Sequence, residues 1–170
     1  MASAMDKAAQ GGIEGIQALF ALPGGEPAFF GMKEEAELLA TVRRAVPGAE
    51  NVFWGVDYEV AGDRTLLRRL QELDPPESAR ESLAALIEAS SSSWAKYEET
   101  NNPQYVFSFS GDPALVTSVR ASWPDAGPEA TSILDALQST LEINQFWVQG
   151  KGFASNQRRA DFLRQNFLDH

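Results

Sequence analysis

The chain has 170 residues, of which 44% are hydrophobic, so it is long and apolar enough to bury one hydrophobic core. Its 24 acidic and 14 basic side chains give a formal net charge of -10. This charge argues against a nucleic-acid or anionic-membrane surface, because phosphate groups are bound by clustered cations. The absence of cysteine excludes disulfides, thiolate catalysis and cysteine-ligated metals, and the one histidine is the terminal His170.

The N-terminal part is predicted to begin with a flexible lead-in over 1–12, followed by a single globular domain over 13–170. The apolar residues of IEGIQALFAL recur at helical spacing and predict a short helix that ends at LPGGEP. This stretch is too short and too polar to span a membrane, so we expect a cytoplasmic protein with no membrane partner. KEEAELLATVRRAV predicts a second helix, with its glutamates first and its arginines last, as the helix dipole favours.

Two segments alternate between apolar and polar residues, as do strands that are covered on one face. NVFWGVDYEV (51–60) is the clearer of the two, and QYVFSFSG (104–111) repeats the pattern. A third segment, LEINQFWVQ (141–149), has apolar residues on both faces and is predicted to be a central strand. We therefore predict an α+β fold with a small, largely antiparallel or mixed sheet of three to four strands and several helices packed on one face.

The remaining segments are predicted to be helices. Asp63 and Asp112 each follow a glycine at a predicted helix start, where an acidic side chain caps the first turn. The predicted helices lie over 62–73, from about Pro76 to Glu98, over 111–122 and over 127–140.

The polar sides of the first two predicted strands carry Asp57, Glu59 and Ser108. Two carboxylates about 7 Å apart on a strand can hydrolyse glycosides or hold a hard metal ion. No ligand-rich segment accompanies this pair, so we interpret the three residues as an exposed polar sheet face. We expect no metal, no cofactor and no catalytic residue.

A cluster of cations lies near the C-terminus, where Lys151, Arg158 and Arg159 occur within a stretch that has no acid. We predict that Ser155 caps a helix there, which would place both arginines in the first turns, against the helix dipole. Two interpretations stay open. The cations pair with acids elsewhere on the chain, or together with Ser155 and the backbone N–H groups of Gly150-Lys151-Gly152 they bind an anion.

Two classes of function fit these observations. The first is a non-enzymatic cytosolic protein-interaction module of the inhibitor, immunity, chaperone or adaptor type, whose acidic surface binds a basic or amphipathic protein. The alternative is a small binding domain or enzyme that acts on an anionic small molecule at 150–159. The serines have no histidine within the fold to activate them, which favours the first class. The oligomeric state is left open.

Overall fold

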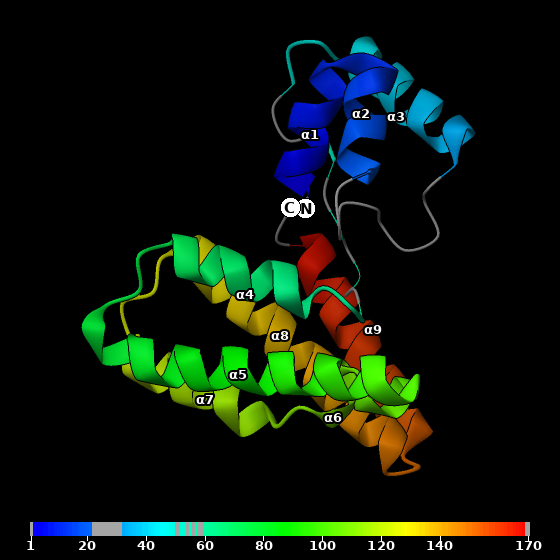
Figure 1. Ribbon diagram of the computed structural model, residues 1–170. Coiled ribbons are helices and arrows are strands. Elements are labelled where there is room, and N and C mark those ends of the chain that lie inside the picture. The colour runs from blue at the N-terminus through cyan, green and yellow to red at the C-terminus, as the bar shows by residue number, and fades with distance from the viewer. Residues whose placement is uncertain are drawn as a thin grey trace. The chain divides into compact units, whose positions relative to one another are not determined.

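The computed structural model describes residues 2–21, 32–49, 52–53, 55, 57 and 60–168, and every regular element in these residues is a helix (Figure 1). The chain divides into two compact units, residues 1–56 and residues 57–170. The flexibility predicted for 1–12 and the folding of 13–170 as one domain stay predictions. None of the described helices is both long enough and apolar enough to cross a membrane.

The α+β prediction is wrong, because the described residues contain no strand. The segment 104–111 instead forms the end of a 3-10 helix, η1 (Pro103–Tyr105), and a short helix, α6 (Phe107–Ser110). The segment 141–149 belongs almost entirely to the long helix α8 (Pro128–Val148). Five residues of the segment 51–60 are described and none is in a strand; the others, among them Glu59, lie outside the described residues.

The reason for the error is clearest in α8. No glycine or proline interrupts the chain between Pro128 and Gly150, so a helix that starts at Pro128 has nothing to end it before Val148. Its core residues recur three or four positions apart, as the helical period requires. They are Ala130, Ile133, Leu134, Leu137 and Leu141. The apolar residues on both faces of 141–149 were a short local pattern inside a longer helical one.

The first unit is a small three-helix cluster of α1 (Ala2–Gln10), α2 (Gly12–Phe20) and α3 (Lys33–Ala45). Its core consists of Met5, Ala9, Ile16, Ala36 and Ala40. The buried carboxylate of Asp6 accepts hydrogen bonds from the backbone N–H groups of Val52 (3.0 Å) and Phe53 (3.3 Å). This side chain attaches the segment that follows α3 to the first helix.

The second unit contains α4 (Asp63–Glu72), α5 (Glu77–Thr100), η1, α6, α7 (Pro113–Ser122), α8 and α9 (Gly152–Leu168). α8 contacts α4, α6, α7 and α9, and α5 packs against α4 and α7 (Figure 1). The largest fully buried side chains of this core are Leu70, Leu86, Phe107, Val116, Val119, Leu134 and Leu141. The unit is therefore a helical bundle with α8 at the centre of its contacts.

The helices predicted from residues 33, 62, 76 and 111 onward are confirmed as α3, α4, α5 and α7. The predicted cap at Asp112 is also confirmed, since its Oδ1 accepts a hydrogen bond of 2.9 Å from the backbone N–H of Ala114. The predicted cap at Asp63 is wrong. Gly62 is the N-cap of α4, and the carboxylate of Asp63 points into the protein interior, where it accepts bonds from α5.

Candidate functional site

The turn between α8 and α9 caps the C-terminal end of α8. It uses Gly150, one of the two glycines of the predicted anion site. Gly150 adopts a positive φ of 72°, its N–H bonds the carbonyl of Trp147 (2.9 Å), and the Lys151 N–H bonds the carbonyl of Phe146 (2.8 Å). This pattern is the Schellman motif, which favours glycine because only glycine adopts a positive φ without strain. The N–H groups of residues 150 and 151 are thus occupied by α8.

Arg158 and Arg159 both pair with acids. The Arg158 Nε lies 2.8 Å from Glu142 Oε2, and its Nη2 lies 2.8 Å from Ser139 Oγ. Arg159 forms an ion pair with Asp57. Because α9 starts at Gly152, these arginines lie beyond its first turn, where the dipole has little effect on them.

The other two residues of the predicted anion site also have protein partners. The Lys151 Nζ donates to Gln149 Oε1 at 2.9 Å, on the surface. Ser155 is not an N-cap, as it lies inside α9, and its buried Oγ donates to the carbonyl of Ile143 at 2.8 Å. This geometry agrees with the interpretation that the two arginines pair with acids of the same chain. Anion binding at 150–159 stays a prediction, which a phosphate titration can test.

The predicted exposed polar face is not assembled as expected. Asp57 is exposed and forms an ion pair with Arg159. Ser108 is only 2% exposed and lies in the helix α6, so the two residues do not share the face of a sheet. Glu59 lies outside the described residues. Ser108 was misplaced because its segment forms a helical turn that buries Phe107 and Ser108 together.

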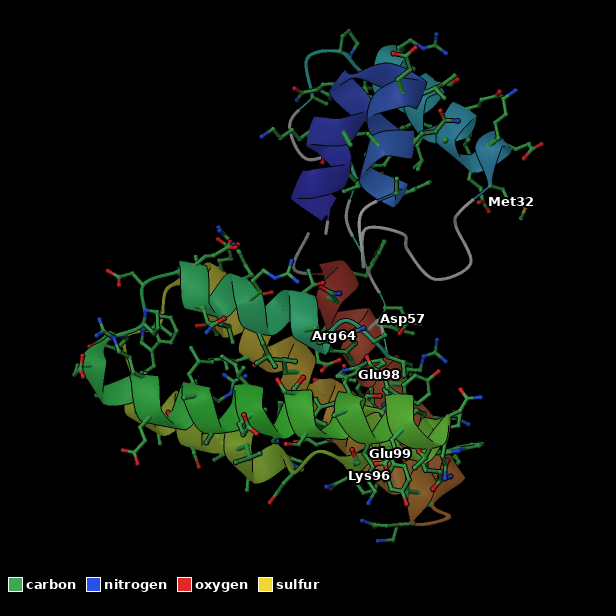
Figure 2. The ribbon with its side chains drawn as sticks, in the orientation of Figure 1. Met32, Asp57, Arg64, Lys96, Glu98 and Glu99 are labelled. Carbon is green, nitrogen blue, oxygen red and sulfur yellow. The ribbon has the colours of Figure 1, made fainter. Side chains whose placement is uncertain are left out.

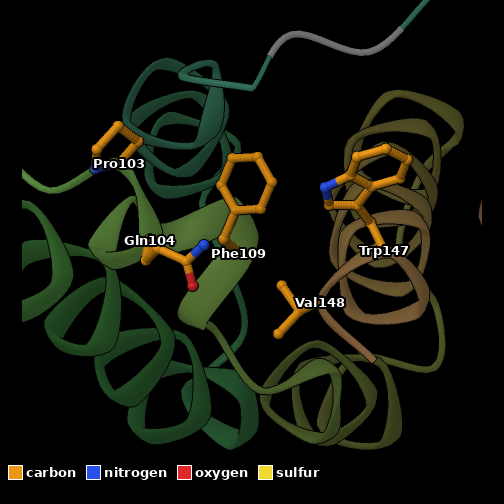
Figure 3. A pocket seen from close by; sticks show the side chains of 5 residues that line it. All are labelled: Pro103, Gln104, Phe109, Trp147 and Val148. Carbon is orange, nitrogen blue, oxygen red and sulfur yellow. The ribbon is translucent and has the colours of Figure 1, made fainter. Parts of the chain in front are cut away.

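An open pocket of about 310 Å³ lies between η1, α6 and the last turn of α8 (Figure 3). η1 contributes Pro103 and Gln104, α6 contributes Phe109, and α8 contributes Trp147 and Val148. In Figure 3 the rings of Phe109 and Trp147 lie on opposite sides of the opening, with Val148 below them. The pocket is therefore apolar and aromatic, with one amide at its edge.

The aromatic surface extends past the pocket. Trp147 is 60% exposed, and Phe153, at the start of α9, is 83% exposed. A large aromatic surface in contact with water is costly for a protein that has a core in which to bury it, and such residues are enriched at protein interfaces.

Charged groups lie at the end of α5, the helix that packs against the pocket-forming η1. The exposed Glu98 and Glu99 lie in the last turn of α5, whose end contacts η1 (Figure 2). On the same turn the Lys96 Nζ lies 4.1 Å from the centre of the Tyr105 ring, a cation–π contact that stabilises η1 against α5. The acids leave this end of the helix negative.

The chemistry open to this pocket is binding. None of the described residues that line it carries an ionisable side chain, so these residues offer no general acid or base. Among the described residues, no group of three or more His, Asp or Glu side chains is placed to hold a metal ion. Apolar burial, with hydrogen bonds to the Gln104 amide or the Trp147 indole N–H, is what the lining supports.

Sequence reasoning missed Trp147, because it assigned the residue to a central strand. The signal was its position just before Gly150, since a helix ending at that glycine carries Trp147 in its last turn, at the end of the bundle.

Comparisons with known proteins found no match to any family model, curated protein or solved structure.

Proposed function

We propose that this chain is a non-enzymatic protein-interaction module that binds a basic, amphipathic protein segment and takes one large apolar side chain of that segment into the pocket of η1, α6 and α8. The observation that carries the proposal is the pair of aromatic walls, Phe109 and the exposed Trp147, around an open pocket of about 310 Å³. Binding energy at protein interfaces is concentrated at such aromatic residues when a partner removes them from water.

The charge of the partner follows from the charge of the chain. The net charge is -10, and Glu98 and Glu99 lie on the helix that contacts the pocket-forming η1. Lysine or arginine residues beside the inserted side chain would be attracted to these acids, which speeds association and selects against acidic partners. A cytoplasmic location belongs to the proposal, and the cysteine-free composition, suited to a reducing compartment, supports it.

The test uses a synthetic lysine-rich amphipathic peptide with one central tryptophan. We expect the peptide to shift the Trp147 indole N–H resonance in NMR spectra of the full chain. We also expect Trp147→Ala to weaken binding about tenfold or more by calorimetry. A second peptide, with alanine in place of its tryptophan, keeps the charge and reports electrostatic attraction alone.

Phe167→Ala provides the matched control, because Phe167 is an exposed aromatic residue near the other end of α9. This variant should bind the tryptophan peptide as the wild type does. Equal affinity of the wild type and Trp147→Ala for that peptide would contradict the proposed function.

A further inference from the structure

A second, much smaller cavity of about 10 Å³, partly open to the surface, lies in the bundle, with Asp63, Ser108 and Thr140 among its walls and apolar side chains around them. It lies among α4, α6 and α8, which contribute one of these polar residues each. A cavity of about 10–15 Å³ measured in this way holds one water molecule.

Asp63 brings a buried carboxylate to this cavity. The residue is 5% exposed, and its Oδ2 accepts hydrogen bonds from Ser90 Oγ (2.5 Å) and Trp94 Nε1 (2.9 Å) on α5. Its other oxygen, Oδ1, is buried and has no hydrogen-bond partner in the described part of the chain. A carboxylate oxygen left in this state is costly, because it loses its hydration without compensation.

Ser108 has the complementary group. The residue is 2% exposed, and its hydroxyl is likewise buried without a partner among the described residues. Thr140, at 9% exposure, adds a third polar wall and a second hydroxyl. Buried polar groups in folded proteins are nearly always hydrogen-bonded to protein or to ordered water, so two such groups around one water-sized cavity call for a shared partner.

We propose that the cavity binds one water molecule that bridges Asp63 Oδ1 and Ser108 Oγ. The water donates one hydrogen to the carboxylate, accepts the hydroxyl hydrogen of Ser108, and donates its second hydrogen to the Thr140 hydroxyl. Calcium and magnesium take a shell of six or more oxygen ligands, and a cavity that holds one water molecule has no room for such a shell. The site is therefore one for water, and it does not depend on the proposed function.

The bound water connects the helices that form the bundle. It links α4, α6 and α8, and Asp63 extends the network to α5 through Ser90 and Trp94. Ser108 lies between Phe107, which is buried in the core, and Phe109, which lines the surface pocket. The water thus fixes the four-residue helix that presents Phe109.

The direct test is a crystal structure of the full chain at a resolution of about 1.5 Å. We expect one ordered water about 2.6–3.2 Å from both Asp63 Oδ1 and Ser108 Oγ. An empty cavity would overturn the proposal. So would a Ser108 hydroxyl that donates to a backbone carbonyl or directly to Asp63. Cross-relaxation between water and the Ser108 amide, measured by NMR, gives the same answer in solution.

A variant pair supplies a second readout. Ser108→Ala removes one anchor of the water and should lower the melting temperature by about 2–10 °C. Ser118→Ala is the control, because the exposed Ser118 Oγ bonds only the carbonyl of its own helix at Ala114 (2.9 Å), and its shift should stay below about 2 °C. Equal shifts in the two variants would count against the bridging water, whatever their size.

Discussion

At the scale of single residues, Gly111 occupies a position where the protein has no room for a side chain. A Cβ atom there would lie 2.7 Å from the Phe107 ring and 2.9 Å from Leu141 Cδ2. Its φ of -70° and ψ of 151° suit any residue, so the constraint is packing and not backbone conformation. This glycine lets α6 lie close to α8.

We expect Gly111→Ala to reduce the free energy of unfolding by about 1–3 kcal/mol, because the added methyl group forces the Phe107 ring or Leu141 to move. Gly127→Ala is the matched control. Gly127 also has an extended backbone, with φ -64° and ψ 169°, and no atom of the described residues lies within 4 Å of an added Cβ. Urea unfolding of both variants checks the prediction, and an equal effect of the two would contradict it.

Trp94 illustrates a residue whose polar atom matters as much as its size. Its Nε1 donates to the buried Asp63 at 2.9 Å, and the Arg64 guanidinium lies 4.1 Å from the ring centre. We expect Trp94→Phe to reduce the free energy of unfolding by about 1–3 kcal/mol, since it removes a donor from a buried carboxylate. Urea unfolding measures this, and Trp147→Phe, at an exposed site, should change stability by less than about 0.5 kcal/mol. Equal losses of unfolding free energy in Trp94→Phe and Trp147→Phe would show that the indole N–H of Trp94 does not stabilise the fold.

At the scale of helices, one ion pair joins α4 to the start of α8. The Arg69 Nε lies 2.7 Å from Glu129 Oε1, and its Nη2 lies 3.0 Å from Oε2. The hydrogen bonds from Arg69 hold the pKa of Glu129 below its ordinary value of 4.5. Both side chains are about half exposed, so solvent screens the pair and keeps its effect small.

The sign of the pH dependence follows from that lowered pKa. A carboxyl group with a lower pKa in the folded state stabilises the protein above its unfolded pKa, and this contribution is lost as the pH falls through the folded pKa. We therefore expect Arg69→Gln to lower the melting temperature by about 1–2 °C at pH 7 and by progressively less as the pH falls below 4.5. Melting curves from pH 7 to about pH 3 measure this difference.

Arg80→Gln serves as a comparison, because Arg80 pairs with Glu77 three residues away on the same helix, α5. That pair joins no two helices, and its loss should change the melting temperature less. A difference between the wild type and Arg69→Gln that grew toward low pH would contradict the assignment.

How well the sequence predicts these helices depends on whether particular residues mark where they start. Asp112-Pro113 and Pro76 mark helix starts with residues that suit few other conformations, and the structure has helices there. The alternating residues of 104–111 and the two apolar faces of 141–149 had no such marker, and two periods competed over a few residues. Burial decided between them. Packing of α8 against α4, α6, α7 and α9 selected the helical period for 141–149, and the absence of glycine and proline from 129 to 149 was the local signal for the same helix.

The candidate sites show the same limit. Asp63 was predicted to cap α4 from its place after a glycine, but its partners Ser90 and Trp94 lie about thirty residues on and reverse the direction of its side chain. The pairing of Arg159 with Asp57 joins residues far apart in the chain. The sequence identified the cation cluster and offered pairing with acids as one of two interpretations; it did not identify which acids pair with the arginines.

At the scale of the whole molecule, the acidic net charge opposes nonspecific binding of anions, so a specific anion site would be readily detected. We expect no specific rise in melting temperature when phosphate replaces chloride at fixed ionic strength. The N–H groups of Gly150 and Lys151 bond to α8, and both arginines pair with acids. A rise that saturates with phosphate and is absent in Arg158→Gln would instead establish an anion site at 150–159.

α8 takes part in four features of the second unit: Glu129 pairs with α4, Thr140 lines the cavity, Glu142 holds Arg158, and Trp147 forms part of the pocket. Its central amides cannot exchange with solvent deuterium by a small local opening, because α4, α6, α7 and α9 must separate from it first. We expect these amides to be the slowest to exchange in the unit, at the rate of its global unfolding. A peptide bound only at Trp147 should then slow exchange along the whole of α8, by the factor that its occupancy adds to the unfolding equilibrium, as mass spectrometry of deuterium uptake can measure. Slowing limited to the last turn would mean that the ends of α8 open independently.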